Sequence, residues 1–149
     1  MATRQDYPTP PEFIEAVQQR LGDSLIWDLA ASPDNAKASR FFTESDDALT
    51  QKWPSGGWCW LNPPYANIRP WVQKAWEESR TGVQIVMLIP ASVGSNWWME
   101  WVTNKAYITF LNGRITFVGH TTVYPKDCAL LLYAPFLEGG SCNWGWRTP

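Results

Sequence analysis

The sequence lacks any long run of apolar residues. No stretch approaches the roughly 20 consecutive apolar residues that a membrane-spanning helix requires, and the polar start MATRQDYPTP lacks the apolar centre of a signal peptide. We therefore expect a cytoplasmic protein with no membrane partner. Internal repeats and low-complexity tracts are also absent, and 149 residues are the length of one compact domain. We expect residues 1–149 to fold as a single domain.

An excess of positive charge is also missing. The 12 Lys and Arg residues stand against 14 Asp and Glu residues, which gives a formal net charge of −2. Proteins that bind duplex nucleic acid usually gain affinity by neutralising phosphates with clustered basic side chains. Any binding of nucleic acid by this chain is therefore expected to be weak and sensitive to salt.

Cysteine and histidine are both scarce. Cys59, Cys128 and Cys142 do not form the CxxC or Cys/His spacing of a metal site, so no metal is expected. We interpret them as reduced, intracellular and unreactive thiols. His120, the single histidine, stands in a Gly-His-Thr turn with no second ligand or acid nearby in the sequence, and we expect no catalytic role for it.

Along the chain, segments with apolar residues at helical spacing alternate with short apolar runs that are typical of strands. The run 83–89 is almost entirely apolar, as in a strand covered on both faces. Thr9 and Glu12 have capping-box spacing before the first helix, and Asn67 is available as a cap for the second. The predicted helices are 10–21, 68–80 and 96–103, and the predicted extended segments are 25–29, 41–42, 58–61, 83–89, 107–111, 115–118 and 129–133.

This order of elements predicts an α/β fold. Strands alternate with helices and a hairpin follows, so we expect a mostly parallel central sheet with an antiparallel C-terminal edge hairpin. Ligands of such sheets bind outside the carboxyl ends of the strands. Two polar side chains are expected there, because Asp28 lies at the end of one predicted strand and Asn62 directly follows another.

The most informative segment is Asn62-Pro63-Pro64-Tyr65. An aromatic amine delocalises its nitrogen lone pair into the ring, so methyl transfer to it needs acceptors that draw the N–H groups out of the ring plane. The Asn62 side-chain oxygen and the Pro63 carbonyl are such acceptors, and proline presets the carbonyl direction. Tyr65 can stack on a base. Asn and Pro are also common turn residues, so a plain turn is the alternative interpretation.

Together with other segments in the same order, this tetrapeptide resembles the phage-type DNA N6-adenine methyltransferases. Their wider class, the amino methyltransferases, has the signature (D/N/S)-P-P-(Y/F/W). The resemblance covers nearly the whole chain. The matching segments are Tyr7-Pro8-Thr9-Pro10-Pro11-Glu12-Phe13, Asp28-Leu29-Ala30-Ala31-Ser32 with Asn35 and Ala36, Phe41-Phe42-Thr43, Asp46-Asp47-Ala48-Leu49, Trp60-Leu61-Asn62-Pro63-Pro64-Tyr65 and Asn112-Gly113-Arg114-Ile115-Thr116-Phe117.

The resemblance implies a Rossmann-like class I methyltransferase fold with S-adenosylmethionine as its cofactor. It implies that Arg114 or Phe117 lies near the target base or its phosphate; a hairpin turn with an inward Phe is the alternative. The implied catalytic residues are Asn62, Pro63, Pro64 and Tyr65.

The implied cofactor contacts come from four segments. One departure concerns the usual Gly-x-Gly turn of the first methyltransferase motif, because the matching stretch 28–32 contains no glycine. The implied contacts are Thr9, Pro10, Asp28, Ala30, Ser32, Asp47, Ala48, Leu49 and Asn62.

We therefore predict a site-specific enzyme that transfers a methyl group from S-adenosylmethionine to N6 of an adenine extruded from DNA. DNA is the expected partner, and the cytoplasm of a bacterial host is the expected location if the chain is phage-encoded. Three alternatives stay open: methylation of a protein glutamine amide, methylation of adenine in RNA, and binding of DNA or cofactor without turnover. None of the cysteines follows a proline, so cytosine C5 methylation through a thiolate adduct is not expected.

Overall fold

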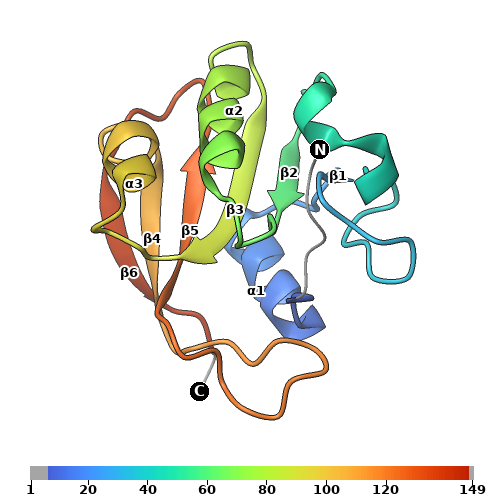
Figure 1. Cartoon of the computed structure of the whole chain (residues 1–149), viewed down its shortest axis with the longest axis vertical. Helices are drawn as coiled ribbons and strands as arrows, with labels where there is room; N and C mark the ends of the chain where they lie inside the picture. The colour runs from blue at the N-terminus through green and yellow to red at the C-terminus, as the bar shows by residue number, and fades with distance from the viewer. Residues whose placement is uncertain (1–6, 148–149) are drawn as a thin grey trace.

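The computed structural model describes residues 7–147. These residues form a six-stranded sheet with helices on both faces (Figure 1). In chain order the elements are α1 (Pro11–Leu21), β1 (Trp27–Asp28), the 3-10 helices η1 (Glu44–Asp46) and η2 (Ala48–Thr50), β2 (Trp58–Leu61), α2 (Arg69–Ser79), β3 (Gln84–Pro90), α3 (Asn96–Trp101), β4 (Tyr107–Asn112), β5 (Cys128–Tyr133) and β6 (Ser141–Gly145).

The strands follow the order β1-β2-β3-β5-β4-β6. β1, β2 and β3 are parallel, β5 is antiparallel to both of its neighbours, and β6 is parallel to β4. All strands but β5 therefore share one direction. The predicted α/β class is confirmed, with a mixed sheet.

The predicted place of the antiparallel hairpin is wrong. β4 and β5 do pair antiparallel, but β5 lies inside the sheet between β3 and β4, and β6 forms the edge. The segment Ser141–Gly145 has no apolar run, and its side chains alternate between exposed and half-buried. A short edge strand does not need a strongly apolar pattern, because it is only partly buried. The sequence therefore gives little indication of β6.

Segment 115–118 is a loop rather than the predicted strand. The side chains of Ile115 and Phe117 are buried, which explains the apolar alternation in the sequence. The backbone makes isolated hydrogen bonds in place of a strand ladder: Tyr124 N–H donates to the Ile115 carbonyl at 2.7 Å, and Val118 N–H donates to the Pro8 carbonyl at 3.0 Å. Alternating burial in this loop therefore reflects packing against the core.

Both predicted helix caps are also wrong. Pro10 is the N-cap of α1 and Ile68 is the N-cap of α2, and neither helix start has a side-chain cap hydrogen bond. The Thr9 hydroxyl accepts a hydrogen bond from Asn62 instead. The Thr9 hydroxyl therefore makes a tertiary hydrogen bond in place of the helix cap that the local sequence predicts.

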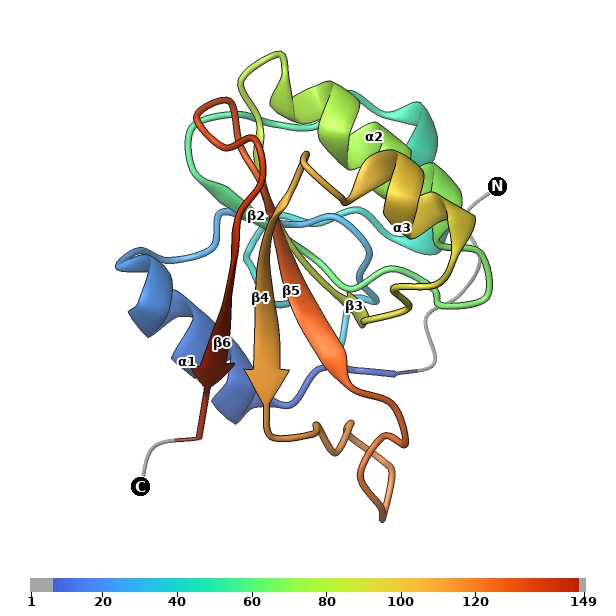
Figure 2. The ribbon, with the colours of Figure 1, turned by 90° about the vertical axis from the view of Figure 1, so that its left-hand side faces the viewer.

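Helices cover both faces of the sheet, as the apolar run 83–89 predicts. α2 and α3 pack on one face and α1 on the other (Figures 1 and 2). Along β3, Ile85, Met87 and Ile89 belong to the core that contains α2, whereas Val86 and Leu88 belong to the core that contains α1. Alternation along this strand therefore fills two apolar layers, which hold the ends of β1 and β2 in place.

Glu78 of α2 is a buried acid that anchors the segment before β2. Its Oε1 accepts a hydrogen bond from the Trp53 backbone N–H at 2.8 Å, and its Oε2 accepts one from Lys52 Nζ at 2.7 Å. Burial opposes ionisation, but these hydrogen bonds and the charges of Lys74 and Lys52 together outweigh it and hold the pKa of Glu78 below its ordinary value. Trp53 is 1% exposed, so water cannot easily replace the carboxylate as its acceptor.

We expect Glu78→Ala to destabilise the fold by about 1–3 kcal/mol, because it leaves the buried Trp53 N–H without an acceptor. Thermal unfolding should show a Tm lower by about 2–4 °C for each kcal/mol lost. Glu77, the exposed neighbour, supplies the matched control, and Glu77→Ala should change stability by less than about 0.5 kcal/mol. Equal Tm values for the two variants would contradict the anchoring role.

Candidate active site

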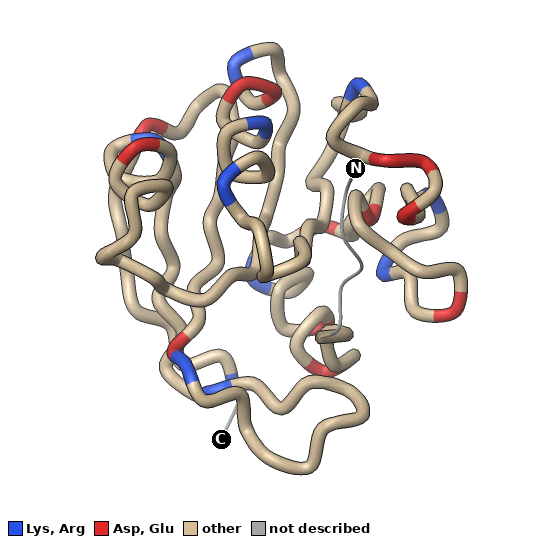
Figure 3. Tube along the Cα trace, in the orientation of Figure 1, with Lys and Arg blue, Asp and Glu red and all other residues tan. Residues whose placement is uncertain are grey.

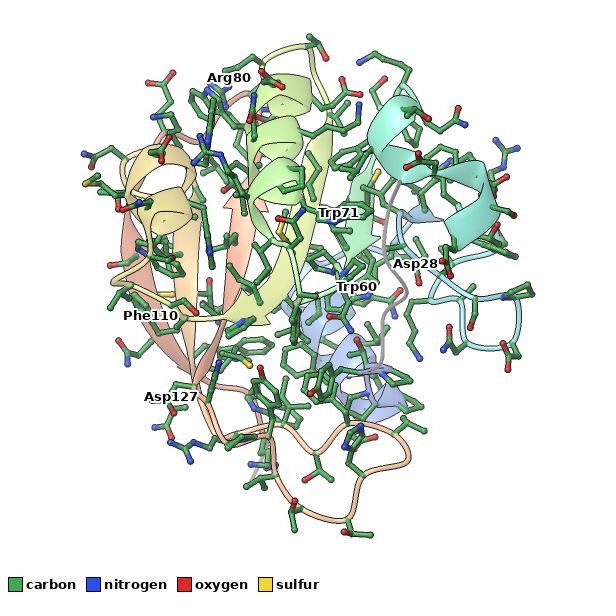
Figure 4. All side chains as sticks on the ribbon, in the orientation of Figure 1. Asp28, Trp60, Trp71, Arg80, Phe110 and Asp127 are labelled. Carbon is green, nitrogen blue, oxygen red and sulfur yellow. The ribbon has the colours of Figure 1, made fainter. Side chains whose placement is uncertain are left out.

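A large pocket lies at the carboxyl ends of β1 and β2. Its volume is about 1200 Å³, which is ample for a ligand of cofactor size. Asp28 ends β1 and pairs in register with Trp60 of β2, and Asn62 follows β2 directly. Asp28, Trp60 and Trp71 lie in the same region of Figure 4, and all of them line the pocket.

Most of the predicted cofactor residues lie around this pocket. Pro10 and Leu49 do not line it: Pro10 caps α1, and Leu49 packs against the core that contains α2. The predicted residues in the lining are Thr9, Asp28, Ala30, Ser32, Asp47, Ala48, Asn62 and Pro64. Lining residues that sequence reasoning did not select include Pro8, Asp34, Lys37, Glu44, Trp60, Trp71 and Val118.

Asn62 is held in one orientation. It is 4% exposed, and its Nδ2 donates to the Tyr7 carbonyl at 2.7 Å and to Thr9 Oγ1 at 3.0 Å. With both N–H groups directed at the N-terminal segment, the side-chain oxygen lies on the opposite side of the amide. An amide oxygen can accept two hydrogen bonds, so this geometry suits an acceptor for a ligand N–H.

The loop after β1, which contains no glycine over residues 28–32, is closed by hydrogen bonds to polar side chains. Asp28 Oδ1 accepts a hydrogen bond from Ala30 N–H at 3.1 Å, and its Oδ2 accepts one from Lys37 N–H at 2.9 Å. Asn35 Oδ1 accepts one from Ser32 N–H at 3.1 Å. Polar side chains thus close the turn, and small residues leave its backbone close to the pocket.

Asp28 is also the main electrostatic feature of the pocket. Its side chain is buried, and burial raises its pKa to about 6, although hydrogen bonds from the Lys37 and Ala30 backbone act in the other direction. A positively charged ligand group would favour the ionised carboxylate. Acidic positions are frequent in this part of the chain, at the right of Figure 3. Among residues 7–147, the acids in the lining are Asp28, Asp34, Glu44 and Asp47, and the one base is Lys37.

Tyr65 belongs to a cluster of aromatic rings beside the pocket, which we call the aromatic cluster: Tyr7, Tyr65, Phe117, His120 and Tyr124. Tyr7 stacks on Tyr65 with ring centroids 5.5 Å apart and 19° between the planes. His120 stacks on Tyr7 at 5.2 Å and 21°. Phe117 and Tyr124 approach Tyr65 at 6.3 and 5.9 Å. Burial raises the pKa of Tyr65 well above its ordinary value, so the phenol is neutral.

The two candidate substrate residues lie in different surroundings. Phe117 is buried in the aromatic cluster, in contact with Tyr65. Arg114 is exposed, its Nε lies 3.1 Å from Asp127 Oδ1, and its carbonyl accepts a hydrogen bond from Arg147 at 2.7 Å. The structure therefore joins Phe117 to Tyr65 and leaves Arg114 at the surface.

Three further observations concern metal ligands, membrane spans and the buried thiols. Among residues 7–147, no three His, Cys, Asp or Glu side chains are grouped so that they could hold a metal ion. No helix in the same range is long and apolar enough to cross a membrane. Cys59 and Cys128 are buried in β2 and β5, and burial raises the pKa of both thiols to about 12, which keeps them protonated.

Fold and pocket together define an α/β protein with a ligand site at the carboxyl edge of its sheet. Residues 1–132 match the family described as DNA N-6-adenine-methyltransferase (Dam). This match covers most of the chain, so the protein belongs to that family of DNA methyltransferases. The resemblance inferred from the sequence is thereby confirmed.

Two phage proteins described as DNA N-6-adenine-methyltransferase are similar to this chain. The protein of Escherichia phage T1 is 33% identical over 115 residues, which are 77% of this chain and 48% of the phage T1 protein. That of Haemophilus phage HP1 is 34% identical over 142 residues, which are 91% of this chain and 82% of the HP1 protein. The chain thus spans about half the length of the phage T1 protein and most of the HP1 protein.

Proposed function

We propose that this chain is an S-adenosylmethionine-dependent methyltransferase that modifies N6 of adenine in DNA, on a Rossmann-like class I methyltransferase fold. The observation that carries the proposal is the position of Asn62. It is buried, oriented by two hydrogen bonds, placed at the pocket and followed directly by Pro63, Pro64 and Tyr65. Family membership supports adenine in DNA as the methyl acceptor.

The pocket fits S-adenosylmethionine in size and charge. When bound, this cofactor supplies a methyl group on a positively charged sulfonium, and it also carries an ammonium group. Asp28 offers a desolvated carboxylate to such a cation, and Asp47 adds a second acid. Ala30 and Ser32 would let the backbone of the loop after β1 approach the cofactor closely. Ala48 and, by the family resemblance, Leu49 would lie near its adenine.

The residues after β2 would position the target amine. Asn62 Oδ1 and the Pro63 carbonyl would accept its N–H groups and draw them out of the ring plane, which restores the nucleophilicity of the nitrogen. Tyr65 would hold the plane of the base by stacking. Rate enhancement then comes from orientation and from stabilising charge on the amine, with no covalent enzyme intermediate.

DNA is the proposed partner. The net charge of −2 implies that phosphate contacts are few, so DNA binding should be weak, with a salt dependence that scales with the small number of those contacts. Arg114 and Phe117 remain candidate DNA contacts, Arg114 for a phosphate and Phe117 for the target base. The cytoplasm of a bacterial host is the proposed location for a phage-encoded chain.

A transfer assay tests this proposal. Purified protein is supplied with methyl-labelled S-adenosylmethionine and, in separate reactions, unmethylated duplex DNA, RNA and a glutamine-containing peptide. Mass analysis of the nucleosides should find N6-methyladenine in the DNA reaction. Measurable cofactor binding without any product would favour a binding module, and label only in RNA or peptide would replace DNA as the substrate.

Thr9 is expected to act through Asn62, because its hydroxyl accepts one of the two Asn62 N–H groups. In Thr9→Val the Tyr7 carbonyl still holds Asn62, so we expect kcat to fall by about three- to tenfold, the effect of one hydrogen bond. The Kd of S-adenosylmethionine, measured by calorimetry, should change much less. Thr9→Ser keeps the hydroxyl and should retain kcat. Parallel losses of kcat and cofactor affinity would place this hydroxyl at the cofactor instead.

A further inference from the structure

The ring of Tyr7 covers the residue that the proposed function assigns to base stacking. It lies almost parallel to Tyr65, with centroids 5.5 Å apart and 19° between the planes. Rings at this spacing are in direct contact, so no third ring fits between them. Tyr65 is also contacted by Phe117 and Tyr124. A base that stacks on the face of Tyr65 covered by Tyr7 must therefore displace the Tyr7 ring.

Tyr7 also contacts the second group that a target base would use. Its backbone carbonyl accepts a hydrogen bond from Asn62 Nδ2 at 2.7 Å. A flipped adenine would present a flat ring to the same Tyr65 but would donate from its amine to the Asn62 oxygen, on the other side of the amide from the Tyr7 carbonyl. The Tyr7 ring and the base thus compete for Tyr65, whereas the Tyr7 carbonyl and the base use different atoms of Asn62.

We propose, on the basis of the proposed function, that the Tyr7 ring occupies the place of the target base in the free protein and is displaced when adenine enters. The backbone need not move. The Tyr7 carbonyl is held by Asn62, and the Pro8 carbonyl is held by Val118 N–H at 3.0 Å. Rotation about the Cα–Cβ bond of Tyr7 is enough to free Tyr65 while Asn62 keeps its orientation.

The surroundings of Tyr7 are partly open. Its side chain is half-buried, and the ring of His120, which also stacks on it, is exposed at the surface. Tyr7 also packs against the core that contains α1 and meets the rings of Phe117 and Tyr124, with centroids 5.3 Å away in both cases, so its ring must leave these contacts when it rotates. Since the base-binding form is only part of the population, the apparent affinity for a base is reduced by the fraction of molecules in which Tyr7 has moved. Removing the Tyr7 ring should remove that reduction.

Binding of a short single-stranded oligonucleotide with one 2-aminopurine tests the proposal, because this base loses fluorescence when it stacks on an aromatic ring. Tyr7→Ala keeps the backbone carbonyl and should lower the Kd by about three- to tenfold, the equivalent of one lost aromatic contact. Tyr7→Phe keeps the ring and should bind as the parent does. In Tyr7→Ala combined with Tyr65→Ala, the gain should disappear. Circular dichroism and Tm confirm that each variant is folded.

Weaker binding by Tyr7→Ala would overturn the proposal, because the ring would then be a wall of the base site; an unchanged Kd would overturn it as well. Methyl transfer to DNA by the parent, measured alongside, separates this result from the proposed function. If the parent transfers methyl groups but Tyr7→Ala binds the oligonucleotide no more tightly, the proposed displacement of Tyr7 is wrong and the proposed function stands. If Tyr7→Ala binds the oligonucleotide more tightly but the parent transfers no methyl group, the proposed function is wrong and Tyr65 is a binding site for an aromatic ring.

Discussion

Asn62→Ala is expected to lower kcat for methyl transfer by about 10²–10³-fold, the usual loss when a preorganised hydrogen-bonding group is removed from a reaction centre. The reason is geometric. The Asn62 amide is fixed by the Tyr7 carbonyl and Thr9 Oγ1, which directs its oxygen away from the N-terminal segment. Without that oxygen the target amine has lost one acceptor, while Asp28 and the rest of the pocket stay in place. Cofactor Kd should therefore remain within about threefold of the parent value.

Asn62→Asp is the matched control for the same position. It keeps an acceptor oxygen but cannot donate to the Tyr7 carbonyl, so we expect activity between that of the parent and that of Asn62→Ala. Single-turnover rates with saturating cofactor and DNA give the comparison. An Asn62→Ala variant that retains kcat, or that loses cofactor affinity in proportion to kcat, would contradict the role assigned to the amide oxygen.

Cofactor affinity is expected to depend on pH through Asp28. Burial raises the pKa of this carboxyl to about 6 in the free protein, and only the ionised form attracts a cation. Affinity for S-adenosylmethionine should be full at pH 8 and fall as the pH drops through 6, to about one tenth at pH 5, because one pH unit below the pKa leaves about a tenth of the group ionised. Calorimetry from pH 5 to 8 measures this slope.

Asp28→Asn should remove the slope and raise the Kd at pH 8 by about tenfold or more, because the charge that meets the cation is lost. Asp34→Asn changes an exposed acid of the same lining and should leave the slope intact. The stability of the free protein depends on pH in the opposite direction from the cofactor affinity. The stabilising contribution of Asp28 is full below 3.8 and is lost as the pH rises through about 6. A Kd for the parent that is constant from pH 5 to 8 would contradict the electrostatic role of Asp28.

Features fixed by local sequence could be predicted. The helices 10–21 and 68–80 and the strands 58–61 and 83–89 were found within a residue or two of α1, α2, β2 and β3. In each of them the apolar spacing is set by the face that is buried. Asp28 and Asn62 could be placed at one sheet edge because each follows a buried strand, and parallel strands bring their carboxyl ends together.

Features that depend on distant contacts could not be predicted. β6 is an edge strand whose place is set by pairing with β4, and the loop 115–118 has strand-like alternation because two of its side chains are buried. Tyr7 stacks on Tyr65, more than fifty residues away in the sequence, and His120 stacks on Tyr7 from still farther along the chain. Thr9 has capping-box spacing, yet its hydroxyl serves Asn62. Local patterns cannot reveal such partners.

The most direct test of the central claim is the N6-methyladenine content of DNA from a bacterial strain that lacks adenine methylation and expresses this chain. Nucleoside mass spectrometry should detect N6-methyladenine with the parent, and none above background with Asn62→Ala at an equal protein level. Absence of the modified base with the parent would contradict the proposed activity. Equal amounts with both proteins would contradict the assignment of the reaction to the site at Asn62.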